Sequence, residues 1–181
     1  MSLLRTMILI PLIALAIAVT GCTQLEDYAD TQPAFKLEQF FDGPLTAHGI
    51  FKDYKGTVIK RFRVDMIGSW EGNVGRLKED FFYDDGTTEQ RIWTITKTDS
   101  GHYVGTAADI KGEAIGTTSG FALNWQYVMR LPVGDTVYNL SFDDWMYRLD
   151  SNTVLNEASV SKLGVTVGKV VLVMHKIESQ Q

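Results

Sequence analysis

The clearest structural signal in the chain is the stretch Phe121–Leu131, FALNWQYVMRL. Apolar or aromatic side chains occupy all of its odd positions, whereas its even positions include Asn124, Gln126 and Arg130. Successive side chains of an extended chain point to opposite faces, so this alternation places one continuous apolar row on one face of a β-strand. Val58–Met66 repeats the pattern. The dominant period is therefore two, which indicates β-structure.

Short turn motifs separate the predicted strands. Rich in Gly, Asn and Asp, they suit hairpin connections and occur at Asp53–Gly56, Gly72–Gly75, Asp84–Gly86, Asp99–Gly101, Pro132–Asp135 and Asp150–Asn152. Between them lie about ten strands, the last at Val165–His175, and the spacing is typical of a sandwich or barrel. Only short helical turns are expected, at 24–29 and 161–164.

The links between the predicted strands are all of hairpin length, and closure of a sheet removes its exposed edges. We therefore predict an all-β fold for residues 35–178: an antiparallel up-and-down β-barrel of about 8–10 strands, similar to lipocalins and other calycins, rather than a Greek-key sandwich. Charged residues such as Lys60, Arg61 and Arg63 within the strands argue against a transmembrane barrel.

Composition bounds the function. The chain has 181 residues, 45% of them hydrophobic and 22% charged, which suits one globular domain. A net charge of −5 argues against a nucleic-acid partner, because such domains usually carry a basic stripe. The single cysteine excludes a disulfide framework, and the three histidines lack metal-ligand spacing. We expect no metal and no cofactor.

The N-terminus predicts an export signal. Met7–Val19 is an uninterrupted apolar run of 13 residues, too short for a membrane-spanning helix of roughly 20 residues. It ends in Val19–Cys22, VTGC, which resembles the lipobox of bacterial lipoproteins. An ordinary signal peptide with a chance cysteine, or a buried helix, is the alternative. The predicted organisation is a signal peptide (1–21, helical), a polar tether (22–34) and the barrel domain (35–178).

The lipobox resemblance implies that the Cys22 thiol receives a diacylglyceryl group and that the signal is cut before it. Two or three acyl chains together anchor a protein stably to a membrane. Thr23, in place of an aspartate after the cysteine, implies sorting to the outer membrane of a Gram-negative cell envelope. The expected location is therefore the periplasmic face of that membrane, with the membrane itself as a partner through the acyl chains.

The tryptophans of the predicted strands are candidates for a cavity wall or for a filled core. Large rings with a few hydrogen-bond donors are the usual lining of a small-ligand pocket, but they also fill small barrels. The Gly68–Gly72 motif, GSWEG, resembles the glycine–tryptophan signature of lipocalin-type barrels, although it lies on a later strand than in that family. A tryptophan there would close one barrel end.

Asp144 is the most unusual residue of the apolar rows. It shares a predicted face with Leu140, Phe142 and Met146, where an unpaired carboxylate would be costly. Arg91, on a face with Trp93, is its candidate partner. The pair would orient the polar head of a ligand, or it would form a buried ion pair without a ligand.

Catalytic motifs are weak. Glu79 and Asp80 point to opposite faces of one strand, and Asp109 and Glu113 lie in a loop-like stretch near a predicted barrel mouth. Paired acids can hydrolyse glycosides, but their separation is not readable from sequence. The Ser-x-x-Lys pattern at Ser159–Lys162 lacks the helical context and domain size of penicillin-recognising enzymes. No catalytic residue is assigned, and a non-enzymatic function is favoured.

Several strings, in order along the chain, resemble one family. They are FFDGPLTAHGI, GSWEGNVGRLKEDFFYDDG, RIWTITKT, ALNWQYVMRLPV, FDDWMYRLD and SKLGVTVGKV, spanning about Phe40 to Val171. These blocks are similar to those of the DUF3833 lipoproteins of bacteria. The resemblance implies a lipocalin-like fold but no activity, because the function of that family is not known.

The functional prediction follows from these observations. We expect an outer-membrane-anchored periplasmic lipoprotein whose barrel binds a lipid, a fatty acyl group or another apolar small molecule. The alternatives are a packed structural or interaction module that docks an envelope protein, and a lipid-modifying hydrolase or isomerase. The candidate ligand-binding residues are Arg91, Trp93, Trp125, Tyr127, Asp144 and Trp145.

Overall fold

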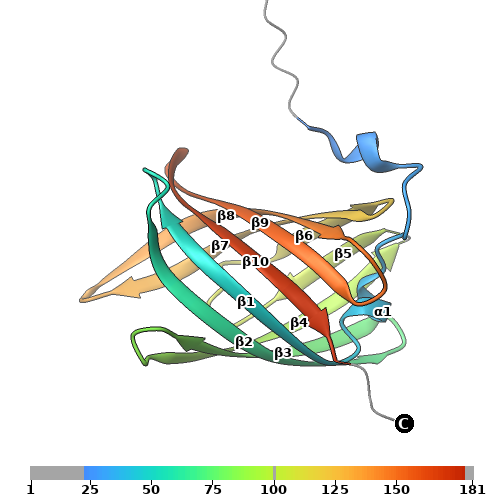
Figure 1. Ribbon diagram of the computed structural model, residues 1–181, viewed down its shortest axis with the longest axis horizontal. Coiled ribbons are helices and arrows are strands. Elements are labelled where there is room, and N and C mark those ends of the chain that lie inside the picture. Colours follow the sequence, from blue (N-terminus) through green and yellow to red (C-terminus); the bar gives the residue numbers. More distant parts are fainter. Residues whose placement is uncertain (1–22, 100, 178–181) are drawn as a thin grey trace, which may run out of the picture.

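The computed structural model describes residues 23–99 and 101–177, and these form a closed ten-stranded barrel (Figure 1). The strands are β1 Gly43–Asp53, β2 Val58–Glu71, β3 Val74–Tyr83, β4 Thr88–Asp99, β5 His102–Thr106, β6 Ala114–Ser119, β7 Ala122–Val133, β8 Thr136–Arg148, β9 Thr153–Lys162 and β10 Val165–Lys176. Each strand pairs antiparallel with its sequence neighbours, and β10 closes the barrel against β1. The predicted antiparallel up-and-down barrel is confirmed, and the sandwich alternative is wrong.

Strand register explains why the sequence period predicted the faces correctly. In the β7–β8 pair, Trp125 lies opposite Asp144 and Tyr127 opposite Phe142, so the two apolar rows share one face. Register shifts occur at Phe51/Lys52, Lys97/Asp99 and Thr166/Gly168, which are all close to strand ends. A bulge inverts the faces only beyond itself. The middle of each strand therefore keeps its alternation.

A short helix closes one end of the barrel. Helix α1, Leu37–Phe40, lies at that end in Figure 1, where Phe35, Leu37, Phe40 and Phe41 are at most 5% exposed. We call residues 35–41 the plug. Lys97 Nζ and Tyr103 Oη both donate hydrogen bonds to Glu38, at 2.5 and 2.7 Å. The sequence pattern did not predict this helix, because four residues are too few to show a helical period.

The glycine–tryptophan motif joins the plug to the wall. Trp70 Nε1 donates a hydrogen bond to the Phe41 carbonyl oxygen at 3.2 Å. A Cβ added at Gly68 would lie 1.8 Å from that same oxygen. Only glycine lets the plug approach β2 this closely. Trp70 of β2 therefore helps to close one end of the barrel, as predicted.

The two predicted helical turns have different outcomes. The 3-10 helix η1, Leu25–Tyr28, occupies the first of them. The second, at residues 161–164, is wrong: β9 continues to Lys162, and Leu163 and Gly164 form the hairpin link with φ of 51° and 80°. Positive φ at both central residues is the geometry of a type I′ hairpin turn.

The segment predicted as a tether lies against the barrel. The Tyr28 ring packs on Phe121, Trp145 and Tyr147, with centroids 5.2, 6.3 and 5.9 Å away. These contacts lie at the plugged end, where β6 links to β7. The predicted signal peptide (1–21) and Cys22 lie outside the described residues. Among the helices that are described, none is long and apolar enough to cross a membrane.

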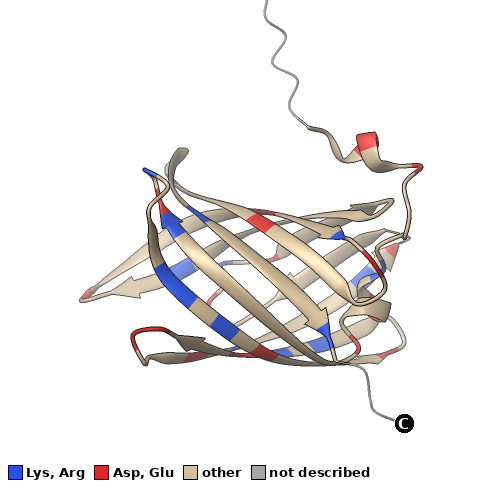
Figure 2. Cartoon of the chain, in the orientation of Figure 1, with Lys and Arg blue, Asp and Glu red and all other residues tan. Residues whose placement is uncertain are grey.

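Charged residues of both signs are distributed along the strands and the hairpin links (Figure 2). Several form ion pairs between neighbouring strands or links, such as Lys60–Asp85 at 3.3 Å and Arg61–Asp84 at 2.9 Å. Exposed pairs of this kind contribute little to stability, about 0–1 kcal/mol each. The fold therefore depends mainly on the buried rows and the plug.

Candidate functional site

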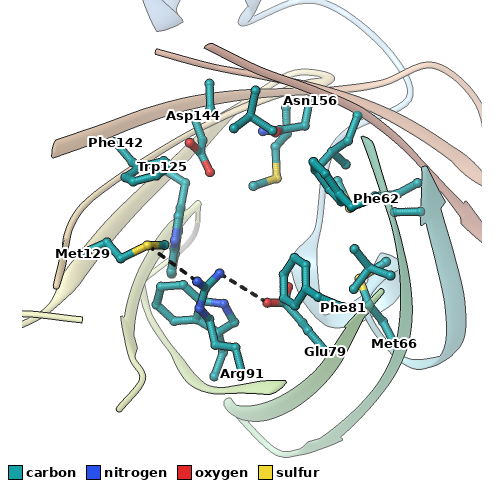
Figure 3. Close-up of a pocket in the computed structure, with 18 of the residues that line it drawn as sticks. Phe62, Met66, Glu79, Phe81, Arg91, Trp125, Met129, Phe142, Asp144 and Asn156 are labelled. Carbon is teal, nitrogen blue, oxygen red and sulfur yellow. Dashed lines mark hydrogen bonds and ion pairs between the residues drawn. The ribbon is translucent and has the colours of Figure 1, made fainter. Parts of the chain in front are cut away.

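The barrel encloses a cavity of about 500 Å³. It begins at the plug residues Leu37 and Phe41 and reaches Lys60, Tyr83 and Glu89 near the opposite end, which we call the mouth. The wall is mainly apolar and aromatic and includes Phe62, Phe81, Trp93, Trp125, Phe142 and Met146. Figure 3 shows Phe62, Phe81, Trp125 and Phe142 around an open centre. The volume lies within the range of roughly 300–1,000 Å³ that is usual for small-molecule sites.

Five of the six candidate residues predicted from the sequence line this cavity: Arg91, Trp93, Trp125, Tyr127 and Asp144. Their role in ligand binding stays a prediction. The sixth, Trp145, does not line it. It follows Asp144 directly on β8, so its side chain points to the outer face, where it packs on Tyr28. The expected contribution of Trp145 to the cavity is therefore wrong.

One side of the barrel is filled by tryptophan. Trp125 packs edge-on against Trp93, with ring centroids 5.7 Å apart. A Cβ at Gly105 of β5 or at Gly116 of β6 would lie 2.4 or 2.3 Å from the Trp125 ring. These glycines therefore leave room for the indole between the short strands and the cavity. Trp125 and Trp93 combine both roles left open by the sequence, because they fill the core on one side and line the cavity on the other.

Arg91 is neutralised by two carboxylates. Its Nε and Nη2 both donate to Asp109 Oδ2, at 2.9 and 2.8 Å, and its Nη1 lies 3.7 Å from Glu79 Oε2. Asp109 belongs to the loop after β5, which the sequence placed near the mouth. The expected Arg91–Asp144 pair is wrong, because Asp109 and Glu79 occupy the guanidinium instead. Strand alternation predicted that Arg91 faces inward but could not predict which acid reaches it.

Asp144 is buried without a cation in contact. Its side chain is 7% exposed, and its Oδ2 accepts a hydrogen bond from Tyr127 Oη at 3.4 Å. Its Oδ1 has no hydrogen-bond partner in the described part of the chain. Burial raises the pKa of Asp144 to about 8, opposed by the hydrogen bond from Tyr127 and by the charge of Arg91. The carboxyl group is therefore mostly protonated at neutral pH.

Asn156 is the second buried polar residue of this wall. It is 3% exposed, and its Nδ2 has no hydrogen-bond partner among the residues described. Asn156 lies opposite Met146, and Asp144 lies opposite Ala158, so the two polar side chains are diagonal neighbours on the inner face of β8 and β9. Figure 3 shows both on the same side of the cavity, across from Arg91 and Glu79.

Sequence reasoning missed Asn156 and did not place Glu79 in the cavity. The signal that singled out Asp144 was available for both, because each is a polar residue in an apolar alternating row. On the inner face of its strand, Asn156 lies between Val154 and Ala158. Glu79 lies in the same way between Leu77 and Phe81, two positions away on either side. Burial raises the pKa of Glu79, and the charge of Arg91 opposes this. The described residues contain no cluster of three or more His, Cys, Asp or Glu able to hold a metal.

The profile of the DUF3833 family, described as a protein of unknown function, matches residues 16–176. The chain belongs to the DUF3833 family. A search of curated protein sequences finds no match to this DUF3833 protein. The barrel resembles the S-type phycobiliprotein lyase CPES from Guillardia theta at 8% identity, with a TM-score of 0.60, over 87% of this chain and all of that one. A de novo designed fluorescence-activating β-barrel matches with a TM-score of 0.41 and 11% identity, over 79% of this chain and 99% of that one. At such identities, the lyase likeness establishes the shared fold alone.

Proposed function

We propose that this DUF3833 barrel binds one apolar or amphipathic small molecule, a lipid or fatty acyl compound, in its central cavity. The observation that carries the proposal is the mainly apolar cavity of about 500 Å³ between the plug and the mouth. Each methylene moved from water into such a site contributes about 0.8 kcal/mol before the costs of binding. A cavity of this kind is otherwise a loss of packing that a purely structural barrel has no reason to keep.

The mouth supports entry of an apolar ligand. Exposed apolar side chains gather on the hairpin tips at this end, namely Tyr54, Ile59, Val133, Val137, Leu163 and Val165, with Leu163 95% exposed. The same tips would serve the alternative in which the barrel docks an envelope protein. A docking module has no need of the cavity, so ligand binding inside the barrel distinguishes the two.

Binding is tested with N-phenyl-1-naphthylamine, an uncharged apolar fluorophore. We expect it to bind the purified protein and to quench Trp93 and Trp125, which line the cavity. Organic extraction of purified protein should also release a stoichiometric lipid, identified by mass spectrometry. A domain that binds no probe and releases no lipid would refute the proposal.

The variant Ala158→Phe should lower probe affinity by at least tenfold. Ala158 is 3% exposed and lines the cavity, so a phenyl ring at this position would occupy the space of the ligand. The matched control is Ser159→Phe, the next residue on β9, which is exposed on the outer face. Fluorescence titration measures both variants. Equal affinities would show that the probe binds elsewhere.

A second candidate function is lipid modification by acid–base chemistry. It is favoured by the convergence of Glu79, Asp144 and Tyr127, all with raised pKa, in one cavity. The described lining contains no Ser, Thr, Cys or His, which disfavours hydrolysis through an acyl intermediate on one of those side chains. Incubation with an unsaturated acyl ester, followed by mass spectrometry and NMR, tests it. Under the binding proposal the ester is recovered unchanged.

We also propose that Cys22 anchors the protein in the outer membrane, with the barrel in the periplasm. The support is the VTGC motif after the apolar run. Because Tyr28 packs at the plugged end, such an anchor would hold the mouth at the far end of the barrel from the acyl chains.

The variant Cys22→Ser tests the anchor in the full chain expressed in a Gram-negative host. Without the thiol no diacylglyceryl group can be attached, so we expect an unlabelled, uncut precursor. Incorporation of radioactive palmitate and the size of the product on a gel measure this outcome. Normal labelling and maturation of the variant would contradict the proposal.

A further inference from the structure

The cavity contains polar atoms that the protein itself does not satisfy. In the described part of the chain, three buried side-chain atoms have no hydrogen-bond partner: Glu79 Oε2, Asp144 Oδ1 and Asn156 Nδ2. All three residues line the cavity. An unsatisfied buried polar atom costs about 1–3 kcal/mol. Glu79 Oε2 has an ion-pair partner in Arg91, but Asp144 Oδ1 and Asn156 Nδ2 have none, and these two atoms indicate a ligand that supplies the missing partners.

Glu79 and the guanidinium beside it do not form a site for an anion. Glu79 Oε2 faces Arg91 Nη1 at 3.7 Å, while Asp109 takes the Nε and Nη2 donors of Arg91. Two carboxylates thus surround one guanidinium, and its charge is already balanced. An anionic head in this cavity would lie beside the Glu79 carboxyl group, and Arg91, the cation next to it, is already paired with Asp109. Such a head is disfavoured by repulsion.

Asp144 and Asn156 differ from that group because neither contacts a cation. Asp144 Oδ2 accepts the Tyr127 hydroxyl, and Oδ1 is left facing the cavity. A buried carboxyl group without a cation is most stable in its protonated form, in which it donates one hydrogen bond. Asn156 Nδ2 presents a second donor from the neighbouring strand. The Asp144 carboxyl group and the Asn156 amide could thus both donate a hydrogen bond to one oxygen atom of a ligand.

We propose that Asp144 and Asn156 form a two-donor subsite for the uncharged carbonyl oxygen of an ester, an amide or a comparable acyl head. The proposal rests on the proposed function, since the apolar part of the ligand would occupy the rest of the cavity. An ammonium head fits less well, because it has no lone pair to accept a hydrogen bond from the Asn156 amide.

The donor role of Asp144 makes binding depend on pH. Burial raises its pKa to about 8, and the groups that act on it are Tyr127 of β7, Arg91 of β4, Glu79 of β3 and Asp143 on the outer face of its own strand. Above that pH the carboxylate no longer donates and repels a carbonyl oxygen. We expect affinity for an acyl head to fall above about pH 8.

The test uses twelve-carbon ligands that differ only in the head. Dodecyl acetate, dodecane, dodecylammonium and dodecyl sulfate compete with N-phenyl-1-naphthylamine for the wild-type protein. The two ions are kept below their micellar concentrations and the two uncharged ligands below their solubility limits. We expect dodecyl acetate to bind about tenfold more tightly than dodecane, the usual effect of one well-made hydrogen bond, and more tightly than either ion. Probe binding without any preference for the acetate would overturn this inference and leave the proposed function intact.

Two variants assign the preference to the subsite. Asn156→Leu should lower the ratio of the affinities for dodecyl acetate and dodecane by about tenfold. The control Met174→Leu, elsewhere on the cavity wall, should leave this ratio unchanged. Asp144→Asn should keep the preference and abolish its decline above pH 8, because asparagine resembles the protonated acid and cannot ionise.

Other outcomes would overturn the inference in recognisable ways. Dodecylammonium as the tightest ligand, lost in Asp144→Asn, would identify a cation site. Dodecyl sulfate as the tightest ligand would identify an anion site around Arg91. If the wild-type domain binds no probe at all, the proposed function fails and the subsite fails with it.

Discussion

Asp144→Asn is expected to stabilise the protein at pH 7 by about 4 kcal/mol. An unfolded aspartate ionises near its ordinary pKa of 3.8, whereas burial raises the pKa of Asp144 in the barrel to about 8. Between these pH values the unfolded chain has released a proton that the folded chain keeps. The free energy of unfolding therefore falls as the pH rises, by about 1.4 kcal/mol per pH unit from this group alone. Asparagine cannot ionise, so the Asp144→Asn variant does not lose this stability as the pH rises.

Urea denaturation at pH 5, 6, 7 and 9 measures this effect. The gain from Asp144→Asn should be about 2 kcal/mol at pH 5, grow up to about pH 8 and stay constant above it. The matched control is Asp143→Asn, one residue earlier on the outer face, where Asp143 accepts hydrogen bonds from Asn124 and Gln126. The difference in unfolding free energy between Asp143→Asn and the wild type should not increase with pH. A destabilised Asp144→Asn variant at pH 7 would mean that Asp144 is ionised and paired in the folded state.

Gly68→Ala is expected to destabilise the barrel by about 3 kcal/mol or more. The added Cβ would lie 1.8 Å from the Phe41 carbonyl oxygen, which is backbone and cannot rotate away. The plug must then move off β2, which breaks the hydrogen bond from Trp70 Nε1 to Phe41 and exposes part of the plug. The four apolar plug residues are at most 5% exposed, so even partial undocking loses much buried surface.

The control for this variant is Ser69→Ala, the adjacent residue of β2, which is exposed. Its stability should match that of the wild type within about 0.5 kcal/mol. Urea denaturation compares the two, and binding of N-phenyl-1-naphthylamine reports whether the cavity survives. Dissociation of the probe should be faster in Gly68→Ala, because the cavity then opens at both ends. Wild-type stability of Gly68→Ala would contradict the close approach of the plug to β2.

Two polar residues at the centre of the barrel lower its stability. Asp144 and Asn156 each leave a buried polar atom unsatisfied, and apolar residues at both positions would pack without this penalty. Such residues are typical of functional sites, where activity needs groups that the fold does not. The plug, in contrast, is held by the hydrogen bonds of Glu38 and Trp70 and by its contacts with the apolar wall. The polar side of the cavity is therefore where a ligand is expected.

The candidate site could be predicted in part from the sequence. The inward positions of Trp125, Tyr127 and Asp144 followed from alternation along single strands, and the structure agrees. The pairing of Arg91 with Asp109 did not, because Asp109 lies on a loop whose path has no periodic signal. Trp145 is also a tryptophan of a predicted strand, but alternation places its side chain on the face opposite to that of Asp144, where it packs on Tyr28.

The amino-acid sequence by itself determined the strands, their hairpin order and the inner face of each, because a period of two is a property of consecutive residues. Only the tertiary structure decided that the barrel keeps an open volume, that residues 35–41 close one end, and that Arg91 is neutralised without Asp144. Each of these depends on contacts between distant parts of the chain, such as Glu38 with Lys97 and Trp70 with Phe41. The free energy of such contacts depends on packing in three dimensions, which no local pattern encodes.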